Sequence, residues 1–288
     1  MVAEGWRIVL VTTVPIVAQT LTDALRGLGH EPAAVLTARR DRPMSDRPMM
    51  TDETAPLGLD VLLPATKQRI EPLLRAYQPD LVVCWGFPWR IPLAALQVPR
   101  LGSINCHPAL LPRHRGPIPL AWAFRDGDGR FGVTWHRMDA EFDTGPILAQ
   151  AVVPMEDDDF DIATVGPRMG AVAIDLLPRV LERVAAGDPG DRQPDEGTTW
   201  AGHFGEDYAS IDWSQPARRI HDQVRAWQFT FGMAPVVGPL AELDGQQVRV
   251  TRTSLTDPGA NARRVEAGDG PIWLVRWEPV GQPAPSTG

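Results

Sequence analysis

The segment Arg7-Ile-Val-Leu-Val-Thr12 is short and almost wholly apolar, which is typical of a β-strand covered on both faces. Residues 15–28 follow with apolar side chains at helical spacing; Pro15 suits the first turn of a helix and Gly29 suits its end. Residues 33–37 are again strand-like. The order strand, helix, strand predicts a parallel sheet with a right-handed crossover.

The rest of the first two thirds of the chain continues this pattern. No glycine-rich fingerprint follows the first strand, where the sequence is Thr12-Thr13-Val14-Pro15, so NAD or FAD binding is not indicated. We therefore expect an α/β protein with a Rossmann-like, mostly parallel sheet. The further elements that we expect are helices at 66–77, 118–125 and 161–186, and strands at 79–86, 102–106, 131–137 and 147–153.

The C-terminal third has a different character. Residues 187–206 are rich in Gly, Pro, Asp and Thr, and a helix over 214–228 follows, with Ser214 as its expected N-cap. Short strand-like pieces come next, so a small β-rich domain is predicted. Those strands are expected at 234–240, 247–255 and 272–277. The predicted domains are a larger α/β domain over 1–189, a linker over 190–206 and a smaller, OB-like C-terminal domain over 207–288.

Two segments remain without a predicted helix or strand. The polar, Arg-rich loop 39–58 is either a solvated insertion or a lid that contacts substrate. The tail 281–288 is expected to be disordered.

Composition narrows the class of protein. The net charge of −8 counts against a general nucleic-acid binder, and no apolar run is long enough to span a membrane. The N-terminus lacks a signal-peptide pattern. The two cysteines, Cys84 and Cys106, lie in apolar strand-like segments and are expected to be buried free thiols. A cytoplasmic protein is therefore predicted.

The chemistry is expected at Gly102-Ser-Ile-Asn-Cys-His-Pro-Ala-Leu-Leu-Pro-Arg-His-Arg-Gly-Pro117. On a strand, Asn105 and His107 leave the same face, and the loop after Met138 supplies the carboxylate of Asp143. An amide donor stabilises an oxyanion, an imidazole relays a proton, and a carboxylate orients the imidazole and raises its pKa. No Ser or Cys is positioned as a nucleophile beside them. Ser103 and Cys106 lie nearby but are expected to face away from Asn105 and His107 or into the sheet. Direct acyl transfer is therefore favoured.

Spacing alone leaves other interpretations open. From spacing alone, Asn105, His107 and Asp143 are also explained by a capping Asn, a hydrogen-bonded core His and a turn Asp. A metal site of His107, His114, His136 and Asp143 lacks any tight ligand spacing.

An aromatic loop follows the strand that ends at Gly86. Because ligands of open α/β sheets bind beyond the carboxyl ends of the strands, this loop is placed at the same edge as Asn105 and His107. Its aromatic residues form either an apolar wall for a flat heterocycle or the closure of the core. The residues concerned are Trp85, Gly86, Phe87, Trp89 and Ile91.

Three segments together resemble the folate-dependent formyltransferases, and above all the methionyl-tRNA formyltransferase group within that family. They are Asn105-Cys-His-Pro-Ala-Leu-Leu-Pro-Arg-His-Arg-Gly116, Gly132-Val-Thr-Trp-His-Arg-Met-Asp139 and Phe142-Asp-Thr-Gly-Pro-Ile-Leu148. Ile211-Asp-Trp-Ser214 also fits the start of the C-terminal domain of the tRNA enzymes. The resemblance covers most of residues 6–240 and implies the formyltransferase fold.

The resemblance also implies roles for particular residues. It makes Asn105, His107 and Asp143 the catalytic residues, with 10-formyltetrahydrofolate as formyl donor, an amine as acceptor and no metal. The pterin is expected near Trp85, Gly86, Phe87, Trp89, Ile91, Asp139 and Phe142, and the acceptor near Arg113, Arg115 and Gly116.

The charge of the C-terminal part departs from what a tRNA enzyme needs. Residues 205–288 hold eight Arg and no Lys against ten Asp and Glu, whereas tRNA binding requires cationic contacts with phosphates. A small-molecule amine or hydroxylamine is therefore the preferred acceptor. The alternatives are a methionyl-tRNA formyltransferase, a 10-formyltetrahydrofolate hydrolase, and a catalytically idle folate-sensing or protein-interaction module. Whether the C-terminal domain binds substrate or a second subunit of a homodimer is left open.

Overall fold

The computed structural model describes the chain except for residues 1–4, 39–49, 51–53, 232 and 281–288. Most of the predicted loop 39–58, including its arginines, lies outside the described residues, and so does the tail 281–288. The described end of that loop contains a short 3-10 helix, η1, at Ala55–Leu57.

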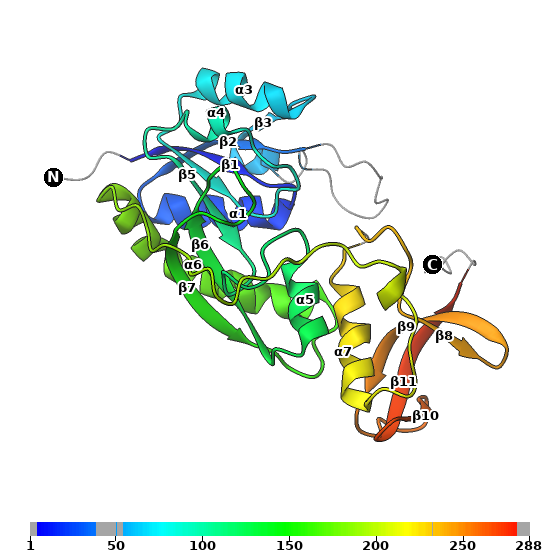
Figure 1. Ribbon diagram of the computed structural model, residues 1–288. Coiled ribbons are helices and arrows are strands. Elements are labelled where there is room, and N and C mark those ends of the chain that lie inside the picture. The colour runs from blue at the N-terminus through cyan, green and yellow to red at the C-terminus, as the bar shows by residue number, and fades with distance from the viewer. Residues whose placement is uncertain (1–4, 39–49, 51–53, 232, 281–288) are drawn as a thin grey trace. The chain divides into compact units, whose positions relative to one another are not determined.

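A seven-stranded sheet is the centre of the larger part of the fold, with strand order β3-β2-β1-β4-β5-β6-β7 (Figure 1). The strands from β3 to β5 pair in parallel, whereas β5 and β6 are antiparallel. The predicted mostly parallel α/β sheet is confirmed. The strands are β1 Arg7–Val11, β2 Glu31–Leu36, β3 Asp60–Leu62, β4 Leu81–Cys84, β5 Ser103–His107, β6 Arg130–Arg137 and β7 Ile147–Pro154.

Helices cover both faces of this sheet, which explains why β1 and β4 are apolar on both sides. Figure 1 places α3 and α4 on one side and α1 on the other. On the α3 side, Val9, Val82, Leu74 and Leu96 share one buried cluster. The helices of this part are α1 Pro15–Gly27, α3 Ile70–Tyr77 preceded by the 3-10 turn η2 Lys67–Arg69, α4 Leu93–Leu96 and most of α6 Ile162–Ala185, whereas α5 Pro119–Asp126 belongs to the other compact unit.

A second, four-stranded antiparallel sheet follows in the C-terminal part, with strand order β10-β11-β9-β8. The predicted small β-rich part is thereby confirmed as an antiparallel half-barrel. The cluster of Ile220, Val224, Val250 and Leu274 joins this sheet to its helix. The elements are η3 Glu206–Tyr208, α7 Ala217–Gln228, β8 Leu240–Leu243, β9 Gln246–Ser254, β10 Arg263–Ala267 and β11 Gly270–Pro279.

Some local predictions were wrong. Helix α7 begins at Ala217 after Pro216, and the predicted N-cap Ser214 instead donates its hydroxyl to Asp212 Oδ1 at 2.7 Å. The strand expected at 234–240 lies at Leu240–Leu243. Strands β3 and β10 and helix α4 were not predicted.

The chain divides into two compact units that are interleaved along the sequence. One comprises Met1–Arg115, Gly132–Val152 and Met169–Thr198, and the other Gly116–Phe131, Val153–Arg168 and Thr199–Gly288. The predicted domain limits at 1–189, 190–206 and 207–288 stay a prediction. Within the described ranges, no helix has the length and apolarity that crossing a membrane requires. Cys84 and Cys106 are buried free thiols, as predicted.

Candidate active site

The carboxyl end of β5 carries the first two candidate residues. Asn105 and His107 are two positions apart on this strand and leave the same face. Asn105 lies directly opposite His136 on β6, and in an antiparallel pair residues opposite each other share a face. The alternation of the strands therefore brings three polar side chains to one face of the sheet.

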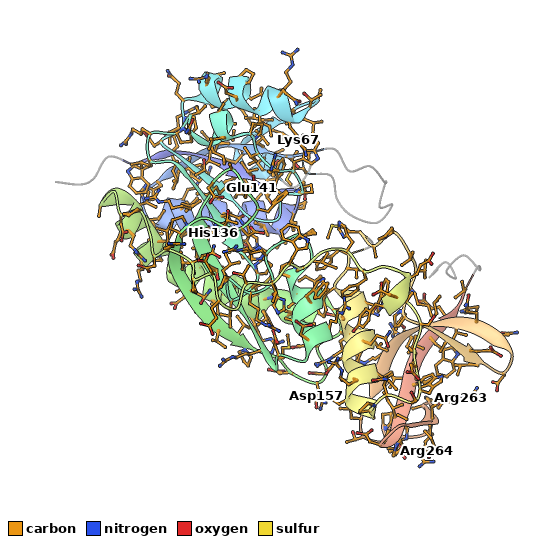
Figure 2. The ribbon with its side chains drawn as sticks, in the orientation of Figure 1. Lys67, His136, Glu141, Asp157, Arg263 and Arg264 are labelled. Atoms are coloured by element: carbon orange, nitrogen blue, oxygen red, sulfur yellow. The ribbon has the colours of Figure 1, made fainter. Side chains whose placement is uncertain are left out.

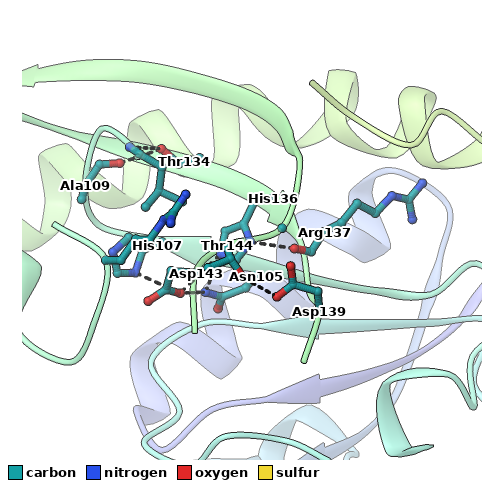
Figure 3. Close-up of polar contacts among 12 residues, drawn as sticks. Asn105, His107, Ala109, Thr134, His136, Arg137, Asp139, Asp143 and Thr144 are labelled. Atoms are coloured by element: carbon teal, nitrogen blue, oxygen red, sulfur yellow. Dashed lines mark hydrogen bonds and ion pairs between the residues drawn. The ribbon is translucent and has the colours of Figure 1, made fainter. Parts of the chain in front are cut away.

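Asp143 converges on these side chains from the loop after β6 (Figure 3). Its Oδ1 accepts a hydrogen bond from Asn105 Nδ2 at 3.3 Å and lies 3.5 Å from His107 Nδ1. The same oxygen lies 3.5 Å from His136 Nε2. The three residues predicted to be catalytic are thus brought together by the fold, and His136 lies among them.

The loop over 138–145 is held in a defined shape. Asp139 Oδ1 accepts hydrogen bonds from Glu141 N at 3.2 Å and from Thr144 Oγ1 at 2.6 Å. Asp143 has a φ of +58°, a left-handed conformation that Asp tolerates better than most residues. A Cβ at Gly145 would lie 1.9 Å from the carbonyl oxygen of Arg137, so the close return of the loop to β6 requires glycine.

Gln193 anchors the backbone of this loop. Its Nε2 donates to the carbonyl oxygens of Asp143 at 2.8 Å and Gly145 at 2.7 Å. Gln193 Oε1 in turn accepts from Arg115 Nε at 3.0 Å and Nη2 at 2.6 Å. The Gln193 side chain is buried, so it is a fixed support for Asp143.

The turn after His107 folds back onto the imidazole. His107 Nε2 lies 2.8 Å from the carbonyl oxygen of His114, to which it can only donate. Thr134 Oγ1 donates to the carbonyl oxygen of Ala109 at 2.6 Å and accepts from Leu111 N at 3.3 Å. These bonds fix the start of the turn on β6 and fix the ring orientation of His107.

The tautomer and charge of His107 follow from these contacts. With the proton on Nε2, a neutral ring presents the lone pair of Nδ1 toward Asp143. Burial lowers the pKa of His107 below its ordinary 6.5, and the Asp143 carboxylate opposes this by raising it. The net direction is downward, so near pH 7 His107 is a neutral base with a carboxylate ready to stabilise its protonated form.

The apolar residues predicted to hold the pterin differ in how deeply they are buried. Trp85 and Ile91 are buried, and Trp85 packs edge-to-face with Trp135 at 6.4 Å, as expected for residues that close the core. Phe87 and Trp89 are only partly buried and pack against each other at 5.8 Å. Gly86 is exposed, and so is Phe142, at 38%.

The aromatic loop and the Asp139–Asp143 loop are joined by an ion pair. Arg90 Nη1 lies 3.1 Å from Glu141 Oε2, with Glu141 labelled in Figure 2. Both side chains are exposed, so the pair contributes little stability, but it shows that the two loops are neighbours. A hollow of about 530 Å³ lies beside Asp139, lined by Leu93, Leu96 and Met138 among others.

The residues predicted to meet the acceptor have structural contacts of their own. Arg115 is the partner of Gln193, and Arg113 is half-buried in the same turn. Gly116 has a φ of +117°, and a Cβ there would lie 3.2 Å from the ring of Trp200. The backbone conformation and the nearby Trp200 ring are therefore enough to require glycine at position 116, whether or not this position also contacts the acceptor.

Two residues that contact Asn105 or the loop of Asp143 were not predicted to support this site. His136 was considered only as a metal ligand, although the pairing of β5 with β6 places it beside Asn105. Gln193 lies in the segment predicted as linker, and no local pattern there points to the loop it holds 50 positions earlier. Ser103 was expected to face away, but it lies two positions before Asn105 on β5 and leaves the same face. Its hydroxyl donates to the carbonyl oxygen of Leu96 at 3.1 Å.

The residues weighed for a metal site do not form one together. Among the described residues, clusters whose metal-binding atoms lie within 4.8 Å of one another do not include His107, His136 or Asp143. The Nε2 atom of His136 instead faces Asn105 Nδ2 at 3.1 Å.

The structure is an α/β fold that brings an amide, an imidazole and a carboxylate together at one sheet edge, a set of groups suited to the class of enzymes that transfer acyl groups. Within that class the chain belongs to the formyl transferase family, which residues 7–181 match. It is a folate-dependent formyltransferase that uses formyl-tetrahydrofolate.

Curated relatives support this assignment. The chain is 32% identical over 259 residues to the methionyl-tRNA formyltransferase of Trichlorobacter lovleyi, covering 87% of this chain and 79% of that protein. It is 31% identical over 295 residues to the methionyl-tRNA formyltransferase of Ruegeria pomeroyi, covering 96% of this chain and 94% of that protein.

Solved structures share the fold at low identity. The sugar 3N-formyl transferase WlaRD, crystallised with dTDP and 5-N-formyl-THF, has a TM-score of 0.67 at 16% identity, over 96% of this chain and 98% of that one. HypX from Aquifex aeolicus, in complex with tetrahydrofolic acid, has a TM-score of 0.67 at 19% identity over 96% of this chain. The chain spans only 44% of the length of HypX.

Proposed function

We propose that this protein transfers the formyl group of 10-formyltetrahydrofolate directly to the amine or hydroxylamine nitrogen of a small molecule. The convergence of Asn105 and His107 on Asp143 at the carboxyl end of β5 is the observation that carries the proposal. These side chains supply an oxyanion donor, a base and its counterion, which is the set that attack of an amine on a formyl carbon requires.

The first step forms the new C–N bond. The acceptor nitrogen attacks the formyl carbon with its lone pair, and the carbonyl oxygen becomes an oxyanion. Asn105 Nδ2, which donates to Asp143 in the structure at 3.3 Å, donates one of its hydrogens to that oxyanion. Since the group is half-buried, the donor acts in a site of reduced dielectric, where such a bond is worth more than in water.

The second step moves the proton of the attacking nitrogen. His107 Nδ1 has a lone pair and accepts this proton, and the imidazolium that forms faces Asp143 Oδ1 at 3.5 Å. The tetrahedral intermediate then collapses by breaking the bond between the formyl carbon and the folate nitrogen. That nitrogen takes up the proton, so the products are a formamide and tetrahydrofolate and His107 returns to its neutral form.

The surroundings of the site are compatible with a folate donor. Phe87 and Trp89 offer partly buried aromatic faces, and the loop they belong to is tied to the catalytic loop through Arg90 and Glu141. Small-molecule sites are largely apolar hollows with a few placed polar groups. When bound, the folate supplies the activated formyl group, and we assign its pterin to these two loops.

The Asp143→Asn variant should change the pH profile in a defined direction. The carboxylate raises the pKa of His107, so its removal lowers that pKa further and moves the acidic limb of kcat to lower pH. The plateau rate should also fall, roughly 10²-fold, because the protonated imidazole loses its counterion. Measuring kcat from pH 4 to 9 tests this. An unchanged profile removes Asp143 from the proton transfer.

The small-molecule acceptor is supported by the charges of the C-terminal part. Five of the eight arginines in 205–288 are paired with acidic residues of the chain: Arg218 with Asp157, Arg225 with Asp222, Arg249 with Glu278, Arg263 with Asp244 and Arg264 with Glu266. Figure 2 labels Arg263 and Arg264 on β10 and Asp157 elsewhere in the same unit. Cations neutralised within the chain are poor contacts for phosphates.

Methionyl-tRNA is the second candidate acceptor, because the curated relatives that cover nearly the whole chain carry that activity. Turnover with each acceptor, compared between about 50 and 200 mM salt, separates the two. We expect formylation of a small amine with little dependence on salt. Formylation of initiator methionyl-tRNA that falls steeply with salt, with no small amine accepted, would favour the tRNA enzyme instead.

A further inference from the structure

We propose that His136 is a positioning residue that fixes the amide orientation of Asn105. The inference rests on the proposed function, since the amide it orients is the donor assigned to the oxyanion. His136 and Asn105 face each other across the β5–β6 pair, and Asn105 Nδ2 lies 3.1 Å from His136 Nε2. The imidazole is buried, with 2% of its surface exposed.

The tautomer of His136 follows from its other nitrogen. Nδ1 lies 2.7 Å from the carbonyl oxygen of Arg137, which only accepts, so Nδ1 carries the proton (Figure 3). In the neutral ring Nε2 then has a lone pair and accepts a hydrogen bond from Asn105 Nδ2. The backbone of Arg137 thereby sets which hydrogen-bonding role His136 presents to the site.

Only one orientation of the Asn105 amide agrees with these partners. If the oxygen and nitrogen of the amide were exchanged, Oδ1 would face the lone pair of His136 Nε2 and also the carboxylate oxygen of Asp143. Both contacts would then join two acceptors. Together, His136 and Asp143 select the orientation in which Nδ2 points into the site.

The two hydrogens of Asn105 Nδ2 have different tasks in this arrangement. One is bound to His136, and the other points to Asp143 Oδ1 at the longer distance of 3.3 Å. The bond to His136 keeps the amide from rotating when the second hydrogen leaves Asp143 for the oxyanion. His136 therefore acts through Asn105, without a contact to the reacting atoms.

Two substitutions separate this role from simple packing. His136→Met keeps an apolar volume but offers Asn105 only a weak acceptor, whereas His136→Gln places a carboxamide oxygen near the position of Nε2. We expect His136→Met to lower kcat about ten- to a hundredfold, less than removal of Asn105 itself, with the KM for 10-formyltetrahydrofolate little changed. His136→Gln should recover much of the loss at an equal melting temperature. Equal kcat in wild type and His136→Met, or equal losses in both variants, would overturn the inference.

A second measurement on the wild-type protein needs no catalysis. The sequence holds only two asparagines, Asn105 and the exposed Asn261, so asparagine labelled with ¹⁵N gives two side-chain amide signals. With histidine labelled as well, we expect a scalar coupling between Asn105 Nδ2 and His136 Nε2, and slower solvent exchange of one Asn105 amide proton. Rapid exchange of both protons without coupling would overturn the inference, even if formyl transfer is active. Coupling in a protein inactive with every amine would instead sink the proposed function alone.

Discussion

The Asn105→Ala variant lowers kcat for formyl transfer about 10²–10³-fold, with a smaller change in KM for the folate donor. The amide nitrogen lies 3.3 Å from Asp143 Oδ1 and 3.1 Å from His136 Nε2. This is where we propose that negative charge develops on the formyl oxygen. Removing it takes away a donor that acts mainly in the transition state. The measurement is steady-state turnover of 10-formyltetrahydrofolate with the best acceptor.

Ser103→Ala is the matched control, because it removes a hydrogen bond from the same strand two residues earlier. Its hydroxyl is bonded to the carbonyl oxygen of Leu96 at 3.1 Å, away from Asp143. We expect this variant to retain nearly full activity. Activity of Asn105→Ala equal to that of Ser103→Ala would exclude Asn105 as the oxyanion donor.

The second large effect is expected at His107, which has two separable functions. Its Nε2 holds the carbonyl oxygen of His114 at 2.8 Å, and its Nδ1 is the proposed base. His107→Ala removes both functions, whereas in His107→Gln the carboxamide nitrogen still donates to that carbonyl. Both variants should lose about 10²–10⁴-fold in kcat, because neither has a base, and only the alanine variant should melt at a lower temperature.

His221→Gln is a control for the loss of a buried histidine. His221 Nε2 also bonds a backbone carbonyl, that of Asp157 at 3.0 Å, in the other compact unit. This variant should keep kcat even if it is less stable. If His107→Gln keeps the wild-type kcat, His107 matters only through its hydrogen bond to the carbonyl oxygen of His114. The assignment of His107 as the base would then be wrong.

The fold was predictable where local pattern and burial agree. The strands predicted at 7–12 and 79–86 contain the buried central strands β1 and β4. The helix predicted at 15–28 ends one residue beyond α1, and the helix predicted at 161–186 exceeds α6 by one residue at each end. The elements that were missed are short or polar. Strand β10, with the sequence Arg-Arg-Val-Glu-Ala, has no apolar face long enough to be recognised.

The site was predictable only in part, because its geometry depends on pairs distant in sequence. Asn105 and His107 could be placed on one face of a strand from their spacing, and Asp143 was expected from the acidic loop after Met138 as well as from the resemblance. The contact of Asn105 with His136 spans 31 positions and depends on the register of β5 with β6, which the sequence pattern does not determine. The bond from Arg115 to Gln193 spans 78 positions and gives a structural partner to a residue expected to bind the acceptor.

The most direct test of the account is the fate of a labelled formyl group. 10-Formyltetrahydrofolate carrying ¹³C in the formyl group is incubated with the enzyme and a panel of amines and hydroxylamines, including initiator methionyl-tRNA. We predict one small-molecule formamide carrying the label, formed in equal amount with tetrahydrofolate and lost in the Asn105→Ala and His107→Gln variants. Labelled formate released without any amine, or label found only on methionyl-tRNA, would contradict it.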